Sequence, residues 1–103
     1  MNIPAKPLSH RKTEPEQRVL YLVGTPIGNL NDISLRAINI LKKVSFIACE
    51  DTRNTGKLLK HLNISNKLLS FHEHNSIEKL DYLISKLQSG DSIALVSDAG
   101  MPL

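Results

Sequence analysis

At residues 20–32 the chain reads Leu20-Tyr21-Leu22-Val23-Gly24-Thr25-Pro26-Ile27-Gly28-Asn29-Leu30-Asn31-Asp32. A short apolar run ends in a turn rich in glycine and asparagine, and an amphipathic helical pattern begins at about Ser34. A strand, a glycine-rich turn and a helix in this order can present backbone N–H groups to a ligand. The glycine spacing fits neither a dinucleotide fingerprint nor a Walker loop. On the glycines alone, an ordinary loop between strand and helix is the better interpretation.

The rest of the chain repeats the alternation of apolar strand and amphipathic helix. Strands are predicted at residues 19–23, 46–49, 67–71 and 92–96, the third being edge-like because a lysine and a serine dilute it. Helices are predicted at 34–43, with Leu35, Ile38 and Leu41 on one face, and at 52–62, where Gly56 weakens the helix. A third helix has its apolar residues between a cap at Asn75 and a stop at Gly90; these are Ile77, Leu80, Leu83, Ile84 and Leu87. The pattern predicts an α/β fold with a parallel sheet, flanking helices and right-handed crossovers.

Polar clusters follow the predicted strands, at residues 24–32, 50–55, 72–75 and 98–102. The carboxyl ends of parallel strands meet at one edge of the sheet, where ligands bind in such folds. Each cluster also has a simpler explanation. Residues 50–53 could begin a helix, the two histidines of residues 72–74 lack a clear third metal ligand, and Asp98 could bond its own turn. The shared edge therefore indicates a ligand site more strongly than any one cluster, and no metal site is predicted.

The composition limits the number of domains, the kinds of partner and the location that this chain can have. The chain has 103 residues, 41% hydrophobic and 22% charged, which suits one small globular domain. Residues 1–18 are rich in proline and basic side chains, and we predict a disordered basic tail before a domain at residues 19–103. The net charge of +3 permits a polyanionic partner without requiring one. A single cysteine, Cys49, and no apolar run near the ~20 residues that span a bilayer predict a cytoplasmic protein without membrane segments.

Four segments together resemble the tetrapyrrole-methylase-like (class III) S-adenosylmethionine methyltransferases in their order and spacing. The nearest branch of that family methylates a cytidine ribose 2′-hydroxyl in the decoding region of 16S ribosomal RNA. The matching segments are Val23-Gly24-Thr25-Pro26-Ile27-Gly28-Asn29-Leu30 with Asp32-Ile33 and Arg36-Ala37, Ala48-Cys49-Glu50-Asp51-Thr52-Arg53, Phe71-His72-Glu73-His74-Asn75, and Val96-Ser97-Asp98-Ala99-Gly100-Met101-Pro102.

The resemblance implies an S-adenosylmethionine cofactor in a cleft between two domains, with the loops after the first and fourth strands side by side. Small residues there let backbone approach the cofactor, and a carboxylate suits its cationic sulfonium. The implied cofactor-binding residues are Gly24, Thr25, Pro26, Gly28, Asp98, Ala99, Gly100 and Met101. Candidates for proton handling or RNA contact, which the sequence does not rank, are Glu50, Asp51, Arg53, His72 and Glu73.

The family's domain continues beyond Pro102, so the resemblance implies the N-terminal part of a two-domain enzyme that forms a homodimer and acts on 16S rRNA in the small subunit. We expect the chain alone to fold from about Val19, to expose an edge of its fourth strand and to self-associate. It should bind S-adenosylmethionine weakly or not at all and transfer no methyl group.

Two alternatives remain open. In the first, a member of the same family acts on a tetrapyrrole, although residues 50–53 and 72–75 resemble the RNA branch. In the second, the chain is a non-catalytic module that binds a nucleotide or RNA.

Overall fold

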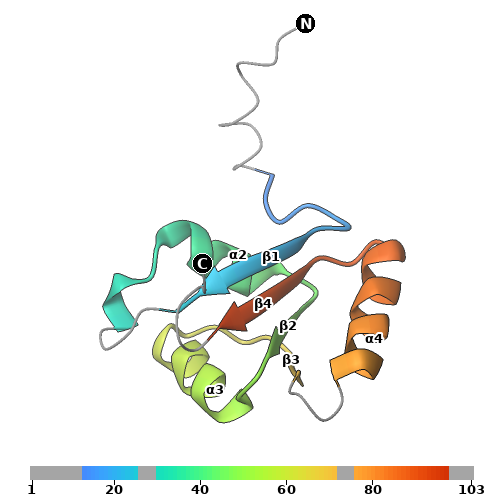
Figure 1. Cartoon of the computed structure of the whole chain (residues 1–103). Coiled ribbons are helices and arrows are strands. Elements are labelled where there is room, and N and C mark those ends of the chain that lie inside the picture. Colours follow the sequence, from blue (N-terminus) through green and yellow to red (C-terminus); the bar gives the residue numbers. More distant parts are fainter. Residues whose placement is uncertain (1–12, 26–29, 72–75, 98–103) are drawn as a thin grey trace, which may run out of the picture.

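The computed structural model describes residues 13–25, 30–71 and 76–97 (Figure 1). The strands in this part of the chain are β1 (Leu20–Gly24), β2 (Phe46–Cys49), β3 (Leu68–Ser70) and β4 (Ile93–Ser97). The helices are α2 (Leu35–Lys43), α3 (Thr52–His61) and α4 (Ser76–Gln88), with a short 3-10 turn, η2 (Leu30–Asp32), before α2. Each predicted strand and helix is present, with ends that differ by at most two residues from those predicted.

The four strands form one parallel sheet in the order β1-β4-β2-β3. This confirms the predicted α/β fold and the edge position of β3. β4 lies centrally and is hydrogen-bonded to β1 on one side and to β2 on the other. The expectation that β4 would expose an edge is therefore wrong, because both of its edges are paired. In the described part of the chain, the outer strands are β1 and β3.

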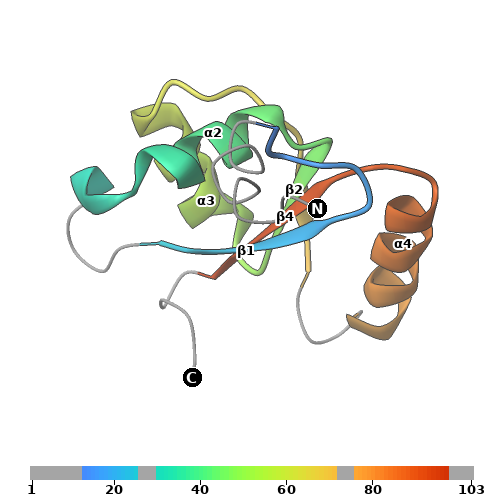
Figure 2. The same ribbon diagram turned by 90° about the horizontal axis from the view of Figure 1, so that it is seen from above.

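The two faces of the sheet carry separate apolar clusters, because successive side chains of a strand point in opposite directions. One cluster joins Tyr21, Ile47 and Val96 to α2 and α3. The other joins Phe46 and Ile93 to Leu83 of α4. Figure 2 shows the same layering, with α2 and α3 on one side of the sheet and α4 on the other. Since α2 and α3 connect strands in one direction along the sheet and α4 leads back, this is the arrangement that right-handed crossovers require.

The helix α2 packs through a face that differs in part from the predicted one. Ser34 caps it by accepting a hydrogen bond from the backbone N–H of Ala37 at 3.1 Å. Leu41 is fully buried and Ile40 nearly so, whereas Leu35 is 85% exposed. The prediction for Leu35 is wrong because six residues at 3.6 per turn place it roughly 120° around the helix from Leu41.

The helix α4 also buries less than its apolar pattern suggested. Leu83 is buried, but Ile77, Leu80 and Ile84 are exposed. Leu22 of β1 is 57% exposed on the sheet face that α4 covers only in part. The predicted stop is confirmed, since Gly90 has a φ of +110° just after the helix. The predicted cap, Asn75, lies outside the described residues.

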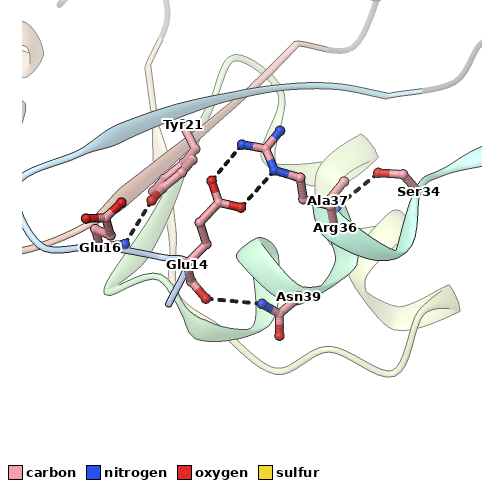
Figure 3. A network of polar contacts seen from close by, with 7 residues as sticks. All are labelled: Glu14, Glu16, Tyr21, Ser34, Arg36, Ala37 and Asn39. Atoms are coloured by element: carbon pink, nitrogen blue, oxygen red, sulfur yellow. Dashed lines mark hydrogen bonds and ion pairs between the residues drawn. The ribbon is translucent and has the colours of Figure 1, made fainter. Parts of the chain in front are cut away.

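Residues 13–18 pack on the domain, although the sequence assigned them to a disordered tail. The Glu14 carboxylate accepts two hydrogen bonds from the Arg36 guanidinium, at 2.8 and 2.7 Å, and its side chain is 2% exposed (Figure 3). Asn39 donates to the Glu14 backbone oxygen, and the Glu16 N–H donates to the Tyr21 hydroxyl. Glu14 and Arg36 are separated by 22 positions in the chain, so their ion pair produces no local periodic pattern that the sequence could reveal. Residues 1–12 of the predicted tail lie outside the described residues.

Gly56→Ala is expected to stabilise the chain by about 0.5–1 kcal/mol, because alanine has the higher helix propensity. Gly56 lies inside α3, and a β-carbon there would meet the Leu68 Cδ1 atom at 3.8 Å, an ordinary van der Waals contact. The midpoint of urea denaturation should rise. A lower midpoint would mean that Leu68 cannot accept the added methyl group.

Candidate active site

The carboxyl ends of β1 and β4 are joined to each other at the predicted ligand edge. Gly24 lies opposite Ser97 in the strand register. The backbone N–H and the hydroxyl of Thr25 both donate to the Ser97 carbonyl oxygen, at 3.1 and 2.8 Å. The loop that follows β1 therefore starts from a fixed position beside the end of β4. Gly24, Thr25 and Ser97 are small and only half-buried, so a ligand can approach their backbone.

The end of β2 continues this edge. Cys49 lies beside Val96 of β4, so the next residues of the chain, Glu50 and Asp51, begin there. Asp51 is the cap of α3, and its Oδ1 atom accepts hydrogen bonds from the backbone N–H groups of Arg53 and Asn54, at 2.9 and 3.3 Å. Capping is thus a sufficient explanation for Asp51. The side chains of Glu50 and Arg53 are exposed.

The helix α3 connects two of the loops at this edge. It begins directly after the polar residues at the end of β2. At its other end, His61 Nε2 lies 3.2 Å from the Asn31 Oδ1 atom of η2, in the connection between β1 and α2. The sequence pattern did not reveal the contact of Asn31 with His61 or the role of the Ser97 carbonyl, because both are contacts between separate segments.

The remaining predicted site residues lie outside the described part of the chain. They are Pro26, Gly28, Asp98, Ala99, Gly100 and Met101 of the cofactor set, and His72 and Glu73 of the catalytic candidates. The structure therefore brings together Gly24, Thr25, Glu50, Asp51 and Arg53 at one sheet edge. Within the described residues, no group of three or more potential metal ligands gathers. Nor is any helix there long and apolar enough to span a bilayer.

A pocket of about 270 Å³ lies at the opposite end of the sheet, beside the first residues of β2 and β3. The rings of Phe46 and Tyr82 form one wall, with centroids 6.1 Å apart, and the Lys86 ammonium lies 5.4 Å from the Tyr82 ring centre. Ligands of open parallel sheets bind at the carboxyl ends of the strands. We therefore assign the candidate site to the edge formed by Thr25, Ser97 and Glu50, and not to this pocket.

Comparison with known proteins gives two kinds of match. The family described as Tetrapyrrole (Corrin/Porphyrin) Methylases matches residues 19–103. A protein of Streptococcus pyogenes serotype M6 named "Ribosomal RNA small subunit methyltransferase I" is 60% identical over 91 residues, which cover 88% of this chain and 32% of that protein. Proteins of the same name from Vibrio cholerae and Escherichia coli O157:H7 are 56% and 52% identical, over 93% and 91% of this chain and 34% and 33% of theirs. The chain thus spans about a third of the length of these relatives.

Proposed function

Because this chain belongs to the tetrapyrrole (corrin/porphyrin) methylase family, we propose that it is part of an enzyme that transfers a methyl group from S-adenosylmethionine to RNA of the small ribosomal subunit. The acceptor we propose is a cytidine ribose 2′-hydroxyl in the decoding region of 16S rRNA. The names of relatives that are 52–60% identical support the RNA acceptor. The full-length enzyme is proposed to act as a homodimer, with this chain forming one wall of its cofactor cleft.

One structural observation carries the proposed cofactor site, namely the link between the ends of β1 and β4. Thr25 donates twice to the Ser97 carbonyl, so the two loops implied in cofactor binding begin side by side. The small residues Gly24, Thr25 and Ser97 leave room for a ligand to come close to the chain at this edge. When bound, S-adenosylmethionine supplies an electrophilic methyl group. The protein must then align the acceptor hydroxyl with that group and accept its proton.

The described candidates suit different parts of this task. Glu50 is an exposed carboxylate at the edge and can accept a proton from a ribose hydroxyl. Arg53 is an exposed guanidinium, a group suited to phosphate. The carboxylate of Asp51 is engaged at the start of α3, so we assign it to holding that helix in place. His72 and Glu73 remain candidates from the sequence alone.

The acceptor is tested by a tritiated-methyl assay with the full-length protein on undermethylated small ribosomal subunits and, separately, on a tetrapyrrole. Methylation of the RNA alone is the expected result, and equal methylation of both would contradict the choice of acceptor.

Titrations with S-adenosylmethionine and with ATP test the alternative of a non-catalytic nucleotide-binding module. Binding of ATP but not S-adenosylmethionine would favour that alternative.

Thr25→Val should weaken cofactor binding by the full-length protein about fivefold, which corresponds to the loss of roughly 1 kcal/mol from one hydrogen bond. Valine keeps the shape of threonine but cannot donate to the Ser97 carbonyl, so the loop after β1 loses one of its two links to β4. Calorimetric titration with S-adenosylmethionine measures the change. Thr52→Val, at an exposed position in the first turn of α3, is the matched control. Equal affinity of wild type and Thr25→Val would show that this link does not position the cofactor loop.

A further inference from the structure

The exposed face of α3 carries a line of three cations, Arg53, Lys57 and Lys60, which we call the basic stripe. Residues three and four positions apart lie on the same side of a helix. At a rise of 1.5 Å per residue, the stripe extends roughly 10 Å along the helix axis. All three side chains are exposed, while the buried side of the helix consists of Thr55, Leu58 and Leu59. The stripe thus faces solvent as one continuous surface.

No carboxylate neutralises the basic stripe within the described residues. α3 contains no aspartate or glutamate, and the adjacent Asp51 directs its Oδ1 atom at the helix backbone. None of the three cations forms an ion pair in the described part of the chain. The helix α4 differs in this respect, because its two lysines are balanced by Glu78 and Asp81.

Helix stability does not explain the stripe. A cation in the last turn favours the helix dipole, which accounts for Lys60, but Arg53 is in the first turn, where a cation is unfavourable. Neither Arg53 nor Lys57 belongs to the apolar clusters that hold α3 on the sheet. An unfavourably placed, exposed cation that serves no packing role indicates a charge kept for a ligand.

The position of α3 connects the stripe to the candidate active site. Arg53 is the fourth residue after the end of β2, and the far end of α3 contacts η2, where His61 Nε2 lies 3.2 Å from Asn31 Oδ1. The stripe therefore runs along the side of the edge at which we propose methyl transfer.

We propose that the basic stripe binds consecutive phosphates of the RNA backbone next to the nucleotide that is methylated. This proposal rests on the proposed function, since it takes RNA as the acceptor. A line of cations matches a line of phosphates, and such contacts fix the register of an RNA without reading its bases. Arg53 makes the contact nearest the strand ends, and Lys57 and Lys60 extend it along the backbone.

The test compares two triple variants of the chain that remove the same charge from different surfaces. Arg53→Gln/Lys57→Gln/Lys60→Gln removes the stripe. Lys67→Gln/Lys79→Gln/Lys86→Gln removes three cations elsewhere, one just before β3 and two on α4. Filter binding to a single-stranded fragment of small-subunit rRNA is measured from 50 to 200 mM salt. Loss of three phosphate contacts should flatten the slope of log affinity against log salt by about 2, so wild type should lose roughly 20-fold more affinity over this range than the stripe variant. The control variant should keep nearly the wild-type slope.

Equal slopes for the two triple variants would overturn the proposal, because net charge alone would then explain binding. Absence of RNA binding by the wild-type chain would overturn it as well. Circular dichroism checks that both variants fold. Titration of the full-length protein with S-adenosylmethionine separates the two proposals. A wild-type RNA slope for the stripe variant, together with cofactor binding by the full-length protein, refutes the stripe alone. A full-length protein that binds neither RNA nor cofactor contradicts both proposals.

Discussion

Leu41→Ala is expected to lower the free energy of unfolding by about 3–4 kcal/mol. Leu41 is fully buried in α2, in the cluster that joins this helix to Tyr21, Ile47 and Val96 of the sheet. Truncation removes apolar contact and leaves a cavity that a close-packed interior fills only in part. For a domain of this size the loss is a large share of the total stability.

Leu35→Ala provides a control within the same helix, because Leu35 is 85% exposed. Its effect should stay within about 0.5 kcal/mol, as for other surface positions. Urea denaturation followed by circular dichroism measures both variants. Equal losses at the two positions would mean that the buried face of α2 is not the one formed by Ile40 and Leu41.

Glu14→Ala is expected to cost about 1.5–3 kcal/mol, the range for hydrogen bonds to charged groups. The Glu14 carboxylate is almost inaccessible and accepts both hydrogen bonds from Arg36 (Figure 3). The hydrogen bond to Glu14 raises the pKa of Arg36 above its ordinary value, with partial desolvation acting in the opposite direction. Because the pKa of Arg36 is raised, the arginine stays charged throughout the neutral range, and the ion pair stabilises the fold fully there. This stabilisation would be lost only as the arginine deprotonates at very high pH. The Arg36 side chain remains 57% exposed, so water partly solvates it when the carboxylate is removed, which keeps the cost below that of breaking a fully buried pair.

Two further variants isolate the cause. Glu14→Gln keeps the shape of the side chain and removes the charge, so it should recover only part of the lost stability. Asp81→Ala, at an exposed position of α4, removes a carboxylate without such contacts and should be nearly neutral. Thermal denaturation of Glu14→Ala, Glu14→Gln and Asp81→Ala measures the loss of stability in each variant. A Glu14→Ala variant as stable as wild type would mean that the ion pair of Glu14 with Arg36 contributes nothing to the stability of the fold.

The sequence predicted those parts of the fold that follow from local periodicity. The strands, the helices, the parallel sheet and the edge position of β3 were all evident from alternating apolar segments. What it could not predict depends on contacts between distant residues. The packing of Glu14 against Arg36 has no local pattern, and the exposure of Leu35 depends on which arc of α2 meets the sheet.

The candidate site shows the same division. The common edge of the strand ends follows from the topology, and the resemblance to the methylase family implied Gly24 and Thr25 as cofactor residues. The double hydrogen bond from Thr25 to the Ser97 carbonyl and the contact of His61 with Asn31 required coordinates. Residue type and position made Asp51 a catalytic candidate, but its carboxylate caps α3 in the structure. Residue type alone therefore does not identify a catalytic group.

The proposed cofactor site lies at the carboxyl edge, where β1 and β4 end, and two-dimensional amide NMR can locate it residue by residue. The labelled chain is titrated with S-adenosylmethionine to millimolar concentration, so that weak binding is still detected. The largest shifts are expected on Gly24, Thr25 and Ser97, with little change at Phe46, Lys67 and Tyr82 around the pocket at the other end of the sheet. Shifts confined to the residues of that pocket would contradict the proposed site.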